Sequence, residues 1–174
     1  MSTVTIRRAE ERDLDSIAVI NAGVFLGDRD DVASAREWIG CWFRSFPLYQ
    51  YFVAEKEARV VGYSGWQLHG GFRRADPAIE LDQIGIHPDE QKSGIGQELI
   101  RYSQRVLIDW TVARNTRIES HITFVVWAYS LNFNAINAYV KTFGQSISGF
   151  RAQFGDRAES MIRHRVPIIL PIRE

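Results

Sequence analysis

The sequence is poor in cysteine and has no excess of charge. Its 174 residues include one cysteine, Cys41, so no disulfide can form within the chain, which fits a reducing compartment. The 21 basic residues equal the 21 acidic residues, whereas a protein that binds nucleic acid usually shows a basic excess. These absences argue against a disulfide-stapled secreted domain and against a nucleic-acid partner.

Long apolar segments are absent as well. The opening stretch MSTVTIRRAEERD has no apolar core of the kind that a signal peptide needs. No apolar run approaches the roughly 20 residues that cross a bilayer. We therefore expect a cytoplasmic protein without a membrane partner. Hydrophobic residues make up 45% of the chain, enough for a full core, and the length predicts a single domain over residues 1–174.

The hydrophobic pattern predicts alternating strands and helices. β-rich or alternating runs predict strands at 3–9, 78–87, 121–130, 146–154 and 159–168, and a hairpin over 49–70 with a charged turn around Glu55 to Arg59. Helical spacing predicts helices at 11–25, 30–46, 93–114 and 133–143. The run at 121–130 is almost wholly apolar, a pattern typical of a strand that is buried on both faces.

The order of these elements predicts the fold class. A strand, a long helix and a second strand in succession imply a right-handed crossover between two parallel central strands. The remaining strands can pair as antiparallel hairpins. The sequence therefore predicts a mixed α/β (α+β) fold, with one mostly antiparallel sheet of about seven strands and flanking helices.

The start of the long helix carries two glycines, Gly94 and Gly96, within its expected first turn. Each glycine costs a helix about 1 kcal/mol relative to alanine. The first backbone N–H groups of a helix lack partners and lie at the positive end of its dipole, so they can bind a phosphate. Glycines would let a phosphate approach without a Cβ in the way, and Gln91, Lys92 and Ser93 add donors at the rim. A helix start that merely contains glycines is the plainer alternative.

Other phosphate, metal and nucleophile motifs find little support. No P-loop string occurs, and Leu99 stands where a dinucleotide fingerprint needs its third glycine. Cys41 lies in a tryptophan-rich helix and is expected in the core. The four histidines form neither a close pair nor a metal motif, so we expect no metal; they are His69, His87, His121 and His164.

The stretch Gln91-Lys92-Ser93-Gly94-Ile95-Gly96 resembles the Q/R-x-x-G-x-G/A signature of the GNAT acetyltransferase superfamily. The strand before it and the order of all elements are similar to that family too. The resemblance implies acetyl-CoA as the donor, with its pyrophosphate on the glycine turn and its pantetheine arm along the preceding strand. The residues implied for cofactor binding are Ile84, Gly85, Ile86, Gln91, Lys92, Ser93, Gly94, Ile95, Gly96 and Gln97.

Gly85 has two interpretations. A bulge there would splay the two parallel central strands and admit the thioester. Alternatively, the glycine only relieves crowding between neighbouring side chains.

Residues 132–141 resemble the family stretch N-x-x-A-I-x-L-Y-x-K. The resemblance implies that Asn132, Asn134 and Ala135 contact the cofactor and that Tyr139 protonates the departing sulfur. A phenol with a pKa near 10 is suited to that transfer, although Tyr139 could also be an ordinary half-buried aromatic. The family's Gly-Phe is reversed here as Phe143-Gly144, which leaves the pairing of the last strands in doubt, while Gly144 can still end the helix.

Two carboxylates, Glu80 and Asp82, lie two residues apart and so on one face of the strand. That placement is costly in a dry core and suits a cavity. Several family members carry a glutamate at the position of Glu80, and the resemblance implies that it is the general base, with Asp82 in reserve. The alternatives are that Glu80 pairs with Arg73 or Arg74, or only orients the substrate.

Aromatic residues are dense in and after the second helix. With Asp82, the side chains of Trp38 and Trp42 are candidates for the acceptor site, because aromatic faces attract ammonium groups. That site would favour an amine with an apolar body, whereas arginines such as Arg73, Arg74 or Arg151 would favour an acidic acceptor. Equally, the aromatics could be core or the surface of a homodimer.

The sequence thus predicts an acyltransferase: an acetyl-CoA-dependent N-acetyltransferase in which a primary amine attacks directly in a ternary complex. The acceptor could be a small molecule or a peptide, through its N-terminus or a lysine. The alternative is a catalytically silent acyl-CoA sensor or interaction module with the same fold.

Overall fold

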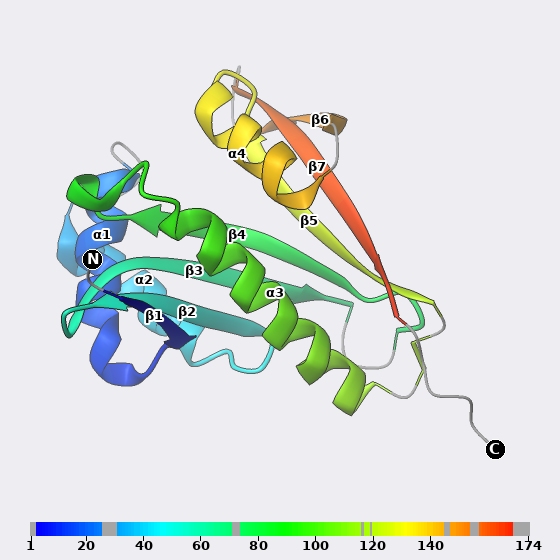
Figure 1. Cartoon of the computed structure of the whole chain (residues 1–174), viewed down its shortest axis with the longest axis horizontal. Coiled ribbons are helices and arrows are strands. Elements are labelled where there is room, and N and C mark those ends of the chain that lie inside the picture. Colours follow the sequence, from blue (N-terminus) through cyan, green and yellow to red (C-terminus); the bar gives the residue numbers. More distant parts are fainter. Residues whose placement is uncertain are drawn as a thin grey trace. The chain divides into compact units, whose positions relative to one another are not determined.

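A computed structural model describes residues 3–25, 31–70, 74–115, 117–118, 120–144, 147–153 and 157–168; within the last two ranges, side chains are described at 148, 149 and 159–168. The strands are β1 Val4–Arg8, β2 Tyr49–Lys56, β3 Arg59–His69, β4 Ala78–Ile86, β5 His121–Tyr129, β6 Ile147–Gln153 and β7 Arg157–Pro167. The helices are α1 Leu14–Val24, α2 Val32–Phe43, α3 Ile95–Arg114 and α4 Phe133–Phe143, with short 3-10 turns η1 at Glu11–Asp13 and η2 at Pro88–Glu90 (Figure 1). The predicted element order is confirmed.

The strands form one seven-stranded sheet in the order β1-β2-β3-β4-β5-β7-β6. β4 and β5 are parallel, with a register from Ala78↔Thr123 to Leu81↔Val126, as the crossover through α3 predicts. The pairs β1/β2, β2/β3, β5/β7 and β6/β7 are antiparallel. The predicted mixed, mostly antiparallel sheet with a parallel central pair is therefore confirmed.

The chain divides into two compact units. Unit 1 comprises Met1–Gln67 and Gln83–Arg105, and unit 2 comprises Leu68–Asp82 and Val106–Glu174. Both β4 and α3 run from one unit into the other. The division does not test the prediction of a single domain over residues 1–174, which stays a prediction.

Unit 1 has its core between α1, α2 and the inner face of its strands. Ile17, Ile39 and Val53 are fully buried there. Its edge is fixed by a fork of hydrogen bonds from Arg7 to Asp13, with nitrogen–oxygen distances of 2.7 and 2.9 Å. Burial raises the pKa of Asp13, but the hydrogen bonds from Arg7 and from a backbone N–H outweigh it and leave the pKa below its ordinary value.

Unit 2 is built on β5, which pairs with β7 over its whole length, from His121↔Pro167 to Tyr129↔Glu159. Helix α4 packs on β7 and β5, and its Phe143 ring lies 6.0 Å from the ring of His164. The prediction that β5 is buried on both faces is wrong. Phe124 and Val126 on one face of β5 are buried, whereas Val125 and Trp127 on the other face are partly exposed. The reason is that α4 covers only one face of the strands β5 and β7.

The end of α4 clarifies the reversed Phe143-Gly144 pair. Gly144 adopts the left-handed conformation with φ 65°, and its N–H donates to the carbonyl of Val140. Gly144 therefore ends the helix as predicted. The strands that follow pair in antiparallel fashion, with a shift of register between Ile147 and Gly149.

No helix in the part of the chain that the structure describes is long and apolar enough to cross a membrane.

Candidate active site

The glycine turn lies in unit 1, between η2 and α3. Helix α3 begins at Ile95, so Gly94 stands just before the first turn. The prediction that both glycines lie within the first turn is therefore wrong for Gly94. Its φ of +91° is costly for any residue with a Cβ. A Cβ built at Gly94 would have no atom within 4 Å, so the space above it is open. The glycine is thus required by the backbone and leaves room for a ligand.

The backbone around Gly94 presents donors to that space. The N–H groups of Gln97 and Glu98 donate to the carbonyl of Gly94, at 3.0 and 3.2 Å. The N–H groups of Ile95 and Gly96 donate to no acceptor among the described residues. Unpaired donors, open space and the positive end of a 20-residue helix together fit a pyrophosphate.

The side chains at the rim mainly brace the turn. Gln91 Nε2 donates to the carbonyl of Ile86 at 3.2 Å, and Ser93 Oγ donates to the carbonyl of Glu90 at 2.5 Å. Lys92 is exposed and has a φ of 62°. Of the three predicted rim donors, only Lys92 directs no hydrogen bond within the described part of the chain.

A lysine anchors the turn to the neighbouring hairpin, a contact that the sequence analysis missed. Lys56 Nζ, at the end of β2, donates to both carboxylate oxygens of Glu90, at 2.8 and 2.9 Å. The hydrogen bond from Lys56 lowers the pKa of Glu90. No local pattern indicates this pair, because 34 residues separate its members.

The second half of β4 lies under the same turn. Ile84 and Ile86 reach to 3.9 and 3.7 Å from the position of a Cβ on Gly96. A Cβ on Gly85 would come within 2.7 Å of the ring of Tyr63 and 3.0 Å of Ile20. This close packing supports the interpretation that Gly85 relieves crowding. The splaying of β4 from β5 stays a prediction.

Unit 2 holds the two carboxylates, and they share a face of β4 as predicted. Ile79 and Leu81 are buried, whereas Glu80 is half-buried and Asp82 is exposed. The side chain of Glu80 keeps 18% of its surface exposed, so it is sheltered but reachable by solvent. This exposure avoids the desolvation cost of a carboxylate in a dry core.

Glu80 is paired with a histidine. Its Oε2 lies 2.8 Å from Nε2 of His69, the last residue of β3. The predicted partner Arg74 instead donates from Nε to Asp76 at 3.2 Å, and Arg73 lies outside the described residues. His69 was not among the predicted partners of Glu80, although β3 and β4 are consecutive neighbours in the sheet and a short connection places the end of one near the start of the other.

Helix α4 carries the remaining predicted residues. Tyr139 is partly exposed, and burial of its phenol raises the pKa to about 12. Asn132 Oδ1 accepts a hydrogen bond from the N–H of Ala135 at 3.1 Å and so caps the helix. Asn134 is exposed. Asn132 and Ala135 are therefore joined by the hydrogen bond that caps α4, and this contact does not depend on a ligand.

The aromatic residues of α2 belong largely to the core of unit 1. Trp38 and Trp42 are half-buried and pack on that core. Their rings meet edge to face, with 5.8 Å between the ring centroids. The ring centroid of Trp42 also lies 4.8 Å from that of Tyr49. These contacts favour the core interpretation over an acceptor wall.

The prediction that Cys41 lies in the core is wrong, because this residue is exposed. The buried face of α2 runs through Ala35 and Ile39, which are one helical turn apart. Cys41 follows Ile39 by two residues and so lies on the opposite side of the helix.

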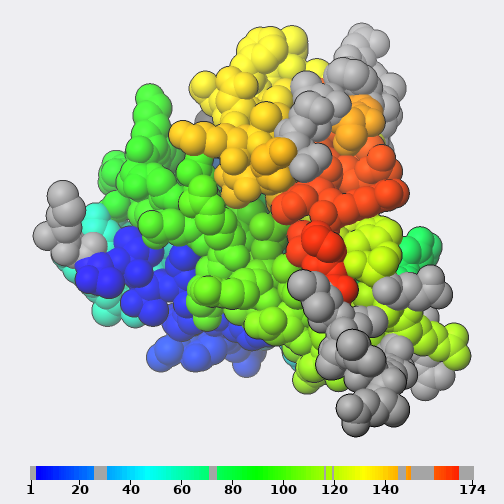
Figure 2. Space-filling model, turned by 45° about the vertical axis from the view of Figure 1, so that its right-hand side comes forward, coloured from blue at the N-terminus to red at the C-terminus, as the bar shows by residue number. Residues whose placement is uncertain are grey.

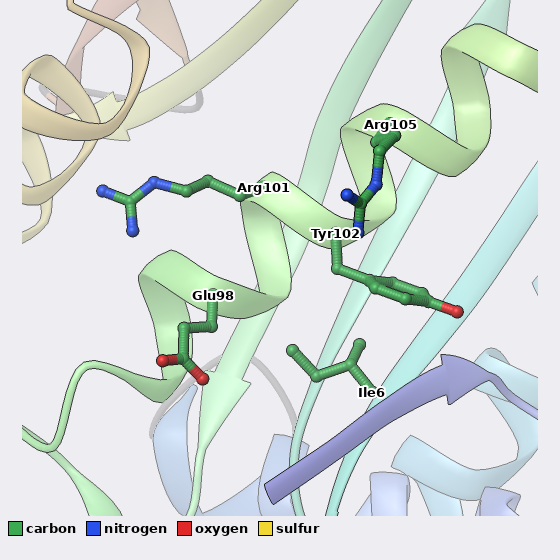
Figure 3. Close-up of a pocket in the computed structure, with 5 residues that line it drawn as sticks. All are labelled: Ile6, Glu98, Arg101, Tyr102 and Arg105. Atoms are coloured by element: carbon green, nitrogen blue, oxygen red, sulfur yellow. The ribbon is translucent and has the colours of Figure 1, made fainter.

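A shallow pocket of about 320 Å³ opens elsewhere on unit 1. Figure 3 shows side chains from successive turns of α3 projecting around it, with Ile6 of β1 opposite. Its lining residues are Ile6, Glu98, Arg101, Tyr102 and Arg105. None of them is a predicted site residue. Within the described ranges, no three histidine, cysteine, aspartate or glutamate side chains gather closely enough to hold a metal ion.

Comparison with known families identifies the class of this protein. The model of the GNAT acetyltransferase family matches residues 17–145, most of the chain. The chain therefore belongs to the GNAT acetyltransferase family and is an acyltransferase that uses acetyl-CoA. A comparison with curated proteins gave no match.

Solved structures share the fold. The ribosomal-protein-S18-alanine N-acetyltransferase of Escherichia coli superposes with a TM-score of 0.70 at 16% identity, covering 99% of each chain. An aminoglycoside 6'-N-acetyltransferase complexed with coenzyme A gives 0.68 at 15% identity, covering 96% of this chain and 99% of its own. The ribosomal-protein-alanine N-acetyltransferase of Brucella melitensis gives 0.65 at 20% identity, covering 93% and 99%. At these identities the likeness concerns the fold alone.

Proposed function

We propose that this protein transfers the acetyl group of acetyl-CoA to a primary amine, by direct attack of the amine in a ternary complex. The observation that carries the proposal is the glycine turn. Gly94 has a φ of +91° with open space above it, and the N–H groups of Ile95 and Gly96 are unpaired within the described structure.

The turn would hold the pyrophosphate of the donor. The backbone donors of Ile95 and Gly96 would face its oxygens, and Lys92 would add a positive charge at the rim. The Lys56–Glu90 ion pair keeps η2 against the hairpin, so the turn is held before the ligand arrives. When bound, acetyl-CoA supplies an activated thioester, with the backbone of Ile84, Gly85 and Ile86 proposed to support its arm.

Two side chains of unit 2 would move the protons. Glu80 takes a proton from the acceptor ammonium, directly or through water, so that the neutral amine can attack. The amide bond would then form as the carbon–sulfur bond breaks. The hydroxyl of Tyr139 would give its proton to the sulfur, and the proton that the nitrogen loses on amide formation would return to the Tyr139 phenolate through solvent. His69 acts through Glu80 and is a positioning residue, because its Nε2 fixes Oε2 at 2.8 Å. The cytoplasmic location and a homodimer stay predictions.

Replacing Tyr139 by phenylalanine is expected to lower kcat by about 10²-fold, at the lower end of the range for general acid catalysis. The affinity for acetyl-CoA should change little, because the ring remains. A pKa of about 12 keeps the phenol protonated at ordinary assay pH, so the wild-type enzyme should not lose this proton donor below about pH 11. Steady-state rates and calorimetric titration with CoA check both parts; an unchanged kcat would remove Tyr139 from the mechanism.

Replacing His69 distinguishes positioning from proton transfer. The amide of His69→Gln can still donate to Glu80, whereas His69→Ala cannot. If His69 positions the carboxylate, the alanine variant should lose about tenfold in kcat and the glutamine variant should stay near wild type. Equal losses in both variants would contradict positioning and assign proton transfer to the imidazole.

The proposed function is tested by following thiol release from acetyl-CoA over a panel of primary amines, with mass spectrometry of the products. Amine-dependent release with an acetylated product supports transfer. Tight binding of CoA without thiol release on any amine would contradict the proposed transfer.

A further inference from the structure

Unit 2 has one sheet face that α4 does not cover. Helix α4 packs against the face that carries Phe124 and His164, as the contact between Phe143 and His164 shows. Side chains alternate along a strand, so the residues between these point to the other face. Figure 2 shows β7, in red, at the surface beside β5, in yellow-green.

The register of the strands places charged residues on that other face in a row. Glu80 of β4 is opposite Val125 of β5, and Val125 is opposite Arg163 of β7. Directly paired residues point to the same side of a sheet. Glu80, Val125 and Arg163 therefore form a row in which two strand spacings, about 10 Å, separate the backbone of the carboxylate from that of the guanidinium.

A second row lies beside the first. Ala78, Thr123 and Arg165 are paired across the same three strands. Arg163 and Arg165 are both exposed, and neither forms an ion pair with another described residue. Two guanidinium groups thus share a face with the carboxylate of Glu80, with the small side chains of Val125 and Thr123 between them.

From this arrangement we infer that the acceptor amine also carries a carboxylate, and that it is a small aminocarboxylate such as a free amino acid. Its ammonium lies at Glu80 and its carboxylate lies at Arg163, with Arg165 beside it. The planar guanidinium fork matches a carboxylate in geometry as well as in charge. This inference rests on the proposed function, because it assigns the substrate of the same site.

The charge pattern favours this class over an amine with only an apolar body. An apolar amine would leave the two arginines of the face without a role in binding. An acceptor with several carboxylates would meet Glu80 and the exposed Asp82, which repel anions. A zwitterion satisfies both ends of the row.

The test compares acceptors that differ only in the carboxylate. Phenylalanine and 2-phenylethylamine, alanine and ethylamine, and lysine and cadaverine form such pairs. Thiol release from acetyl-CoA should give a kcat/KM that is at least about tenfold higher for the amino acid in its pair. Arg163→Gln should raise the KM of the amino acid about tenfold and change that of its partner less than about twofold.

Arg12→Gln is the matched control, since it removes one exposed arginine far from these rows in sequence and should change neither KM. Circular dichroism confirms that each variant is folded. Faster turnover of the amines that lack the carboxylate, or equal effects of Arg163→Gln on both members of a pair, would overturn the inference and leave the acetyltransferase standing. Absence of thiol release with every amine would overturn both.

Discussion

Replacing Glu80 by glutamine is expected to lower kcat by about 10²- to 10⁴-fold, the range that general base catalysis contributes. Glutamine has nearly the same shape but cannot take a proton from the acceptor ammonium. The loss of kcat should be largest at low pH, where the acceptor is protonated. It should be smaller at high pH, where the acceptor has already lost its proton to solvent and needs no base. Initial rates of thiol release across the pH range measure the effect.

Asp82→Asn is the matched control for Glu80→Gln. Asp82 lies on the same strand face, two residues further on, and is exposed. If Glu80 is the base, the Asp82 variant should keep a kcat within about threefold of wild type. A large loss in Asp82→Asn with little change in Glu80→Gln would assign the base to Asp82 instead, and wild-type rates in both variants would remove a carboxylate base from the mechanism.

Replacing Gly94 by aspartate is expected to weaken CoA binding by at least about 100-fold, which corresponds to about 2.7 kcal/mol. The new side chain would enter the open space above the turn, where a Cβ meets no atom within 4 Å. There its carboxylate would repel a phosphate and occupy the approach to the N–H groups of Ile95 and Gly96. Calorimetric titration with CoA measures the loss.

Gly94→Asn separates charge from backbone strain in this experiment. Asparagine has the shape of aspartate and tolerates the left-handed region better than most residues, so both variants keep the same backbone demand at φ +91°. We expect Gly94→Asn to bind CoA more tightly than Gly94→Asp by tenfold or more. Equal affinities of the two variants for CoA would show that the charge of the new side chain does not affect binding at the turn. Wild-type affinity for CoA in both folded variants would refute a phosphate site there.

Most of the fold could be read from local patterns. The helix α3 and the strands on either side of it follow from periodicity, and the parallel pairing of β4 with β5 follows from the crossover between them. The burial of β5 could not be read in the same way. Its apolar run is compatible with one or two covered faces, and only the position of α4 decides between them.

The features of the candidate site that lie within short stretches of sequence were predicted. The contacts between residues far apart in the sequence were not. The alternation that puts Glu80 beside Asp82, and the glycine before α3, are properties of short stretches. The contact of Glu80 with His69 depends on how β3 returns into β4, and the row to Arg163 depends on β7 lying next to β5. Such pairings are set by sheet order, which the sequence pattern leaves open.

The proposed reaction is direct transfer of the acetyl group from acetyl-CoA to an amine. It is tested by initial rates of thiol release, measured while acetyl-CoA and the fastest acceptor of the amine panel are both varied. We expect release that requires the amine, with double-reciprocal lines that intersect, because both substrates are bound before transfer. Parallel lines would contradict direct transfer, and thiol release that is absent or independent of the amine would contradict the claim that this protein is an N-acetyltransferase.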